Sequence, residues 1–160
     1  MTVQFLKRCL SKLAKWRFLS AIERGLLLKA LVLLLAARLM LVLVPFQVWR
    51  PMLLKLISVQ APHEASRSRD SEVKLSQVIR AIDQASWLVP GVKCLARALT
   101  AGILLRRYGF VPSLQLGAKL DRSMGFSAHA WVVCDGSVVI GGIPELDQYS
   151  MLQVQEGIPL

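Results

Sequence analysis

The chain has 160 residues, of which 54% are hydrophobic and 19% are charged. This length fits one domain, or a small domain with an attached segment, and the composition excludes an intrinsically disordered chain. Three cysteines are too few for a disulfide-rich secreted scaffold, and their low, odd number is typical of a reducing cytosol. We therefore expect a cytoplasmic protein.

The net charge of +10 is concentrated near the N-terminus. Residues 1–60 hold ten Lys and Arg against one acid, Glu23, whereas residues 61–160 hold ten against nine acids. A basic surface usually binds nucleic acid, an anionic membrane or an acidic protein. The sequence has no zinc-finger spacing, no RNP-like aromatic motif and no tight Lys/Arg cluster, so we do not expect nucleic acid as a partner.

Residues 26–46 form a Leu-rich stretch of about the length that crosses a bilayer. Lys29 and Arg38 interrupt it, about 180° apart around a helix, and Pro45 ends it. Three alternatives stay open: a helix packed on the protein or on a partner, a helix lying in the plane of a membrane face, and a true span. The stretch is too far from the start for a secretory signal. A mixed apolar and basic pattern over residues 3–19 predicts another surface helix.

The character of the sequence changes after residue 60. Residues 61–71 have no apolar period and are predicted to form a linker or loop. This divides the chain into a basic, Leu-rich helical segment, residues 1–60, and a core domain, residues 72–160.

The second part of the chain predicts two helices followed by strands. Helical spacing covers residues 72–86, with Ser71 as N-cap, and about residues 94–108, where two arginines and a glycine mark the C-terminal end. Period-two alternation then predicts strands over residues 113–120 and 126–134.

The last predicted strand completes a hairpin. Asp135-Gly136 is a strong turn signal, and residues 137–140 return as the third strand. Two helices followed by three antiparallel strands predict an α+β fold.

Cys94 and His129 are the candidate catalytic residues. Cys94 begins a helix directly after a Pro-Gly turn and Lys93, where free N–H groups and the helix dipole favour a thiolate. His129 follows thirty-five residues later on a strand, on the same face as Trp131 and on the face opposite to Cys134. Nucleophilic thiol catalysis needs such a thiol and imidazole. The alternatives are a buried structural cysteine and a core or rim histidine; Trp131 is equally compatible with a cleft wall and with the core.

Four blocks of the sequence resemble the transglutaminase-like leader peptidases of lasso-peptide biosynthesis. They are residues 89–99, 104–109, 115–118 and 126–132, in the order and spacing of that family. The likeness extends over roughly residues 20–155. It implies a papain-like or transglutaminase-like cysteine protease core behind an N-terminal Leu-rich helical segment.

The resemblance also implies an activity. It points to a cysteine peptidase that cuts the leader from a ribosomally synthesised lasso-peptide precursor, with Cys94 as nucleophile and His129 as general base. The implied partners are the precursor peptide, a separate leader-recognition protein and a lasso cyclase. No cofactor is expected, since the chain has no Gly-rich phosphate loop, and no metal is expected, since Cys134 and His129 face opposite ways on their strand and cannot readily share one. The expected location is the cytoplasm or the inner membrane face, with residues 1–60 available for membrane or partner contact.

The third catalytic residue is the part of the resemblance that fails. In the family an Asp stands twelve residues after the His, and here that position is Gly141. If Asp135 and Gly136 form the turn, the hairpin register predicts that His129 lies opposite Gly142, so a carboxylate at 141 or 142 would reach the imidazole.

Other groups are candidates for this role. Asp135 lies at the hairpin tip, roughly 20 Å from His129 along the strand at about 3.3 Å per residue, which is too far for a contact. Glu145 or Asp147 would have to fold back to the site. A backbone carbonyl, or a Cys-His dyad without a third member, would also suffice.

Three further functions remain as alternatives. One is a related peptide transacylase on the same scaffold. Another is a non-catalytic module that binds the leader or precursor after loss of its catalytic group, which Gly141 favours. The third is a small membrane-anchored protein whose second half is only structural.

Overall fold

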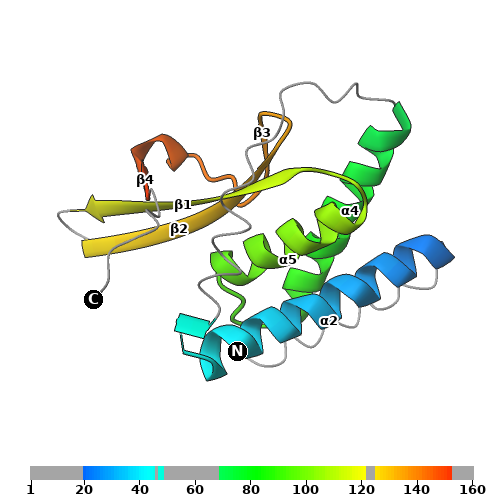
Figure 1. Cartoon of the computed structure of the whole chain (residues 1–160), viewed down its shortest axis with the longest axis horizontal. Coiled ribbons are helices and arrows are strands. Elements are labelled where there is room, and N and C mark those ends of the chain that lie inside the picture. The colour runs from blue at the N-terminus through cyan, green and yellow to red at the C-terminus, as the bar shows by residue number, and fades with distance from the viewer. Residues whose placement is uncertain (1–19, 46, 49–68, 122–124, 153–160) are drawn as a thin grey trace.

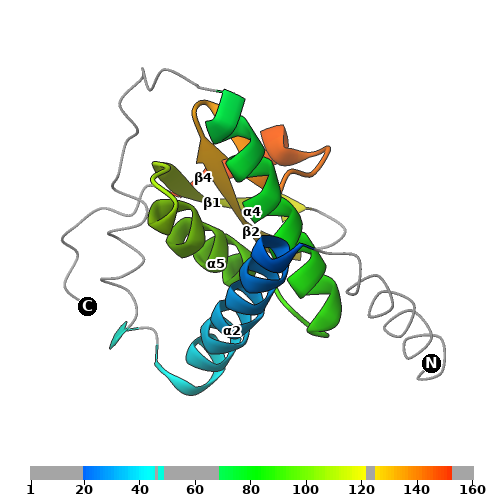
Figure 2. The ribbon, with the colours of Figure 1, turned by 90° about the vertical axis from the view of Figure 1, so that its right-hand side faces the viewer.

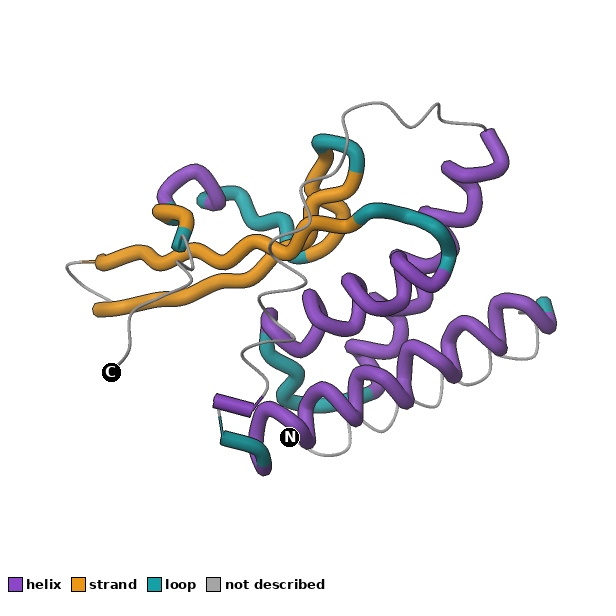
Figure 3. Tube along the Cα trace, viewed as in Figure 1, coloured by secondary structure: helices purple, strands orange, loops and turns teal. Residues whose placement is uncertain are grey.

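Three helices and a four-stranded antiparallel sheet make up the described part of the protein. The computed structural model describes residues 20–45, 47–48, 69–121 and 125–152 (Figures 1 and 3). The elements in chain order are α2 (Ala21–Leu43), α4 (Arg69–Leu88), α5 (Cys94–Arg107), β1 (Pro112–Asp121), β2 (Gly125–Cys134), β3 (Ser137–Ile140), the 3₁₀-helix η2 (Leu146–Gln148) and β4 (Ser150–Met151). This order confirms the predicted α+β fold.

Helix α2 starts earlier than the Leu-rich stretch because Ser20 caps it. The Ser20 hydroxyl accepts a hydrogen bond from the Glu23 N–H, and the Glu23 carboxylate accepts one from the Ser20 N–H, which completes a capping box. The helix ends at Leu43, just before Pro45, as predicted. The helix predicted over residues 3–19 lies outside the described residues.

One side of α2 belongs to the protein core, and the other faces outward. Its buried residues lie on the side toward α4 and α5, beside both of which it runs in Figure 2. They are Leu26, Leu27, Ala30, Leu34 and Ala37. In the described part of the chain α2 is also the one helix long and apolar enough to cross a membrane. The alternative of a protein-packed helix is therefore correct for this inward side.

Helix α4 begins inside the predicted linker. It starts at Arg69, so the prediction that Ser71 caps the helix is wrong, and residues 69–71 are helical. The predicted domain limits stay a prediction, because residues 49–68 lie outside the described part.

Helix α5 matches its prediction closely. It starts at Cys94 after Lys93, whose backbone is extended, and ends at Arg107. Gly109 follows with a φ of +84°, a left-handed conformation that favours glycine and stops the helix.

The sheet has the order β3-β2-β1-β4, and every pair is antiparallel. The predicted turn is present: Asp135 and Gly136 have φ of +50° and +76°, and Cys134 pairs with Ser137. A bulge follows, since Val132 pairs with Ile140. The bulge shifts the register by one residue.

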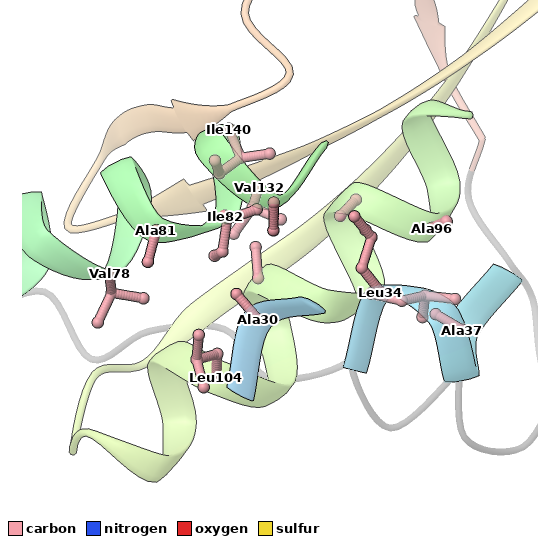
Figure 4. Close-up of a cluster of buried hydrophobic side chains, with 14 of the residues drawn as sticks. Ala30, Leu34, Ala37, Val78, Ala81, Ile82, Ala96, Leu104, Val132 and Ile140 are labelled. Carbon is pink, nitrogen blue, oxygen red and sulfur yellow. The ribbon is translucent and has the colours of Figure 1, made fainter. Parts of the chain in front are cut away.

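The helices cover one face of the sheet. In Figure 1, α2 and α5 lie on one side of the long β1–β2 ribbon and η2 lies on the other. Figure 4 shows how Val132 and Ile140 of the sheet meet Ile82 of α4 in the core. This helix-covered face is apolar throughout, as the alternation in β2 predicts.

The face of the sheet opposite to the helices is covered by a segment that the sequence patterns did not predict. After β3 the chain passes through η2, and β4 then pairs with β1 at Gly117 and Ala118. This short segment brings Tyr149 beside the hairpin.

Candidate active site

Cys94 occupies the first turn of α5. Its residue is partly buried and packs against the edge of the hydrophobic core. Lys93, the N-cap residue, makes no side-chain hydrogen bond to the helix start. The backbone N–H groups of this turn are therefore not capped by that side chain, and they are donors suited to a negative charge beside the thiol.

His129 lies on β2, opposite Gly117 of β1. Its Nε2 is 2.7 Å from the carbonyl oxygen of Gly141. A carbonyl oxygen only accepts hydrogen bonds, so Nε2 carries the proton and donates it. In the neutral ring, Nδ1 is then unprotonated and able to accept a proton.

Aromatic side chains fix the plane of the imidazole. Trp131 stacks on it with ring centroids 6.1 Å apart and an interplanar angle of 18°, and Tyr149 lies against it at 5.7 Å. Trp131 is 3% exposed, and its indole N–H donates to the Gln115 side chain at 2.6 Å. Trp131 is thus buried on the face of His129, and it supports the imidazole from that side.

Tyr149 is a site residue that sequence reasoning missed. Its hydroxyl lies 3.2 Å from the Ser127 hydroxyl. A Cβ added at Gly117 would lie 2.8 Å from the Trp131 ring and 2.9 Å from the Tyr149 side chain. Glycine at 117 therefore lets both aromatic side chains approach β1 closely. No local sequence pattern connects Tyr149 to His129, because the contact depends on the return of the chain to β1.

The backbone of Gly141 takes the place predicted for an Asp. The predicted pairing of His129 with Gly142 is wrong, because the bulge advances β3 by one residue. Gly141 has a φ of +81°, and a Cβ there would lie 2.7 Å from the Ala130 carbonyl oxygen. A side chain is thus excluded at this backbone conformation. Of the alternatives for the third catalytic group, the carbonyl is the one in contact with the imidazole.

The acidic candidates do not reach the imidazole. Asp135 is at the hairpin turn, and Glu145 and Asp147 are exposed around η2. Among the described residues, the hydrogen bond of the His129 ring goes to Gly141, and none goes to these three carboxylates. Nor does a cluster of three His, Cys, Asp or Glu side chains suited to a metal occur in the described ranges.

The described structure does not join Cys94 to His129 by a hydrogen bond. Ala130 and Val132 alternate with His129 along β2 and face the helices, so the imidazole points to the opposite face. Cys94 packs on the helix-covered side. Cys134 is fully buried, as predicted for a residue that faces away from His129. The pairing of Cys94 with His129 stays a prediction.

A hollow of about 350 Å³ lies between α4 and the start of α5. Val92 and Arg97 line it two and three residues from Cys94, and Trp87 lines it from α4. Arg97 pairs with Asp83 there at 2.6 Å. The hollow has both an apolar wall and charged groups, on residues that flank Cys94 in the sequence, and the sequence patterns did not predict it.

Comparison with known proteins agrees with this fold. No curated protein and no solved structure matches the chain. A family model of the Transglutaminase-like superfamily matches residues 40–154, which include α4, α5, the sheet and both candidate catalytic residues. The chain therefore belongs to the transglutaminase-like superfamily.

Proposed function

We propose that this protein is a cysteine peptidase that removes the leader from a lasso-peptide precursor, with Cys94 as nucleophile and His129 as general base. The superfamily includes cysteine peptidases, and the four sequence blocks described above support the finer assignment. The observation that carries the proposal is the hydrogen bond from His129 Nε2 to the Gly141 carbonyl. It fixes the tautomer whose Nδ1 takes a proton from a thiol.

The first chemical step is acylation of Cys94. The thiol proton passes to His129 Nδ1, and the sulfur attacks the carbonyl carbon of the scissile peptide bond. The backbone N–H groups at the start of α5 stabilise the oxyanion that forms. The C–N bond then breaks, the imidazolium gives its proton to the leaving amine, and the leader remains attached to sulfur as a thioester.

The second step is hydrolysis. Water loses a proton to the imidazole and attacks the thioester carbonyl, and the thiolate leaves and is reprotonated. In both steps the Gly141 carbonyl holds the ring by accepting the hydrogen bond from Nε2–H, in the neutral and in the charged imidazole. A carbonyl supplies only part of the stabilisation that a carboxylate would give to an imidazolium.

Catalysis requires the thiol and Nδ1 to meet. In the structure the imidazole lies on the sheet face opposite to the helices and Cys94 packs on the helix-covered side, so the proposal includes a rearrangement that brings the two groups together when the precursor and a leader-recognition protein bind. The hollow lined by Trp87, Val92 and Arg97 would receive a precursor side chain next to the scissile bond. The freed core peptide would pass to a lasso cyclase in the cytoplasm.

Reconstituted cleavage tests the proposal. The full chain is mixed with its precursor and leader-recognition protein, and products are identified by mass spectrometry. We expect cleavage at one bond, abolished by Cys94→Ala and by His129→Ala. Cys134→Ala is the matched control, because it removes a thiol on the core side of β2 and leaves the site intact.

A non-catalytic leader-binding module is the second candidate. The absence of a carboxylate beside His129, within the described ranges, favours it. It predicts that the unchanged protein binds precursor under reducing conditions and releases no product, and that Cys94→Ala binds equally well. Leader binding by fluorescence anisotropy, measured beside the cleavage assay, separates the two functions.

A further inference from the structure

The outward side of α2 is a continuous apolar stripe. Five of its members follow one another at spacings of four and three residues, and the sixth is adjacent to the last of them. Together they extend over about 22 Å of helix and are between 46% and 75% exposed. They are Leu28, Val32, Leu35, Leu39, Val42 and Leu43. An exposed apolar surface of this kind marks an interaction site.

The two charged residues that interrupt the Leu-rich sequence of α2 do not lie on this stripe. Lys29 Nζ donates to the Tyr108 hydroxyl at 3.3 Å and lies over its ring. Arg38 donates to the Pro90 carbonyl oxygen. At 3.6 residues per turn, both cations lie about 90° to either side of the centre of the stripe. The stripe itself carries no charge, and its borders are basic.

This geometry excludes a helix surrounded by lipid. The inward residues of α2, such as Leu26, Ala30 and Leu34, belong to the hydrophobic core that α2 shares with α4 and α5. Immersing α2 on all sides would break that core. A helix with one side on the protein and an apolar outer side is oriented to lie parallel to a membrane surface.

The charge distribution of the chain favours an anionic membrane as the partner of this stripe. Residues 1–60 contain ten Lys and Arg and one acid, while the rest of the chain is almost neutral. Two copies paired through this stripe would bring two strongly basic segments together. We propose that the α2 stripe lies on the surface of an anionic membrane, with its leucines in the interface and Lys29 and Arg38 at the level of the lipid headgroups.

Vesicle binding of the full chain tests this proposal. Large vesicles of equal parts phosphatidylglycerol and phosphatidylcholine are sedimented with the protein, beside vesicles of phosphatidylcholine alone. We expect binding to the anionic vesicles that weakens with salt. Replacing both Leu35 and Leu39 by Glu should weaken it on the order of a hundredfold, because lost apolar contact and repulsion by the lipid charge add together.

The matched control places the same two charges elsewhere. Leu120 and Phe126 are exposed partners near the far end of the β1–β2 hairpin, and Leu120→Glu with Phe126→Glu should leave binding unchanged. Circular dichroism checks that each variant is folded. Leu35→Gln with Leu39→Gln replaces the first variant if that one does not fold.

Several results would overturn the proposal. They are failure of the unchanged protein to bind anionic vesicles, equal binding to both vesicle types, and equal effects of the two double variants. A dimer in sedimentation equilibrium that dissociates on Leu35→Glu with Leu39→Glu would also overturn it, because a second copy would then cover the stripe.

Discussion

The two faces of the sheet are built in different ways. The helix-covered face is closed by buried aliphatic side chains, among them Leu104, Val132 and Ile140. The opposite face is closed by aromatic and polar groups around His129, under a segment with only one short helical turn and a two-residue strand. The stability of the first face depends on the apolar area that it buries. The arrangement of the second face depends on individual hydrogen bonds and close contacts. The aliphatic core and the imidazole of His129 thus lie on opposite sides of the same strands.

The helix-covered face should respond most strongly to loss of volume. Leu104 is fully buried in α5, and Leu104→Ala should lower the free energy of unfolding by about 2–5 kcal/mol. Leu120→Ala is the control, because Leu120 is 82% exposed and should change stability by less than about 0.5 kcal/mol. Urea unfolding followed by circular dichroism measures both. Equal effects would show that α5 does not pack on the sheet as described.

The site face should not tolerate a carboxylate at position 141. Gly141→Asp requires a left-handed conformation and meets the Ala130 carbonyl, so it should cost about 2 kcal/mol or more of stability and should not raise the peptidase activity. Gly142→Asp is the matched variant, since a Cβ there has only ordinary contact with Val138 at 3.6 Å. Thermal unfolding of both proteins checks this difference. A Gly141→Asp protein as stable as the parent would contradict the backbone conformation that supports His129.

Loss of the hydrogen bond between Trp131 and Gln115 should lower the free energy of unfolding by a smaller amount. Trp131→Phe keeps most of the ring on His129 but leaves the Gln115 oxygen without its donor, at a cost of about 1–3 kcal/mol. Combining it with Gln115→Leu should recover part of this loss, because no unpaired acceptor then remains. A double-mutant cycle on unfolding free energies gives the coupling. Strictly additive values would mean that the bond does not stabilise this face.

The smallest expected effect on stability comes from a change at the start of α2. The two hydrogen bonds from Ser20 to the Glu23 carboxylate hold the pKa of that carboxyl below its usual 4.5. A lowered folded-state pKa adds stability above the unfolded-state pKa, and that stability is lost as the pH falls through the folded value. Glu23→Gln should therefore lower stability slightly at neutral pH, and its difference from the unchanged protein should shrink as the pH falls below about 4.5. Thermal unfolding across pH 3–7 measures it, and identical acid slopes would argue against the capping box.

The two faces also differ in how well the sequence predicts them. Alternation in residues 126–134 correctly assigns Ala130 and Val132 to the core, and the Asp135-Gly136 turn is correct because few other dipeptides adopt that conformation. Helical spacing likewise predicts α5 from its first residue. These features depend on local backbone conformation and on the spacing of apolar residues, and both can be predicted from the sequence.

The other face depends on contacts between distant segments. The bulge beyond Val133 shifts the register, so pairing counted from the turn fails at His129. The approach of Tyr149 and the role of the Gly141 carbonyl depend on where the chain returns after β3. The sequence shows only that position 141 is a glycine where a carboxylate is expected. It does not show that the carbonyl of this glycine will contact the imidazole.

Trapping the acyl-enzyme tests the central claim most directly. The protein, its precursor and the leader-recognition protein are mixed, quenched in acid during the first turnover, and mapped by peptide mass spectrometry. The account predicts the leader joined as a thioester to Cys94, and no adduct in Cys94→Ala. Released core peptide with Cys94 unmodified, together with full turnover by Cys94→Ala, would contradict it.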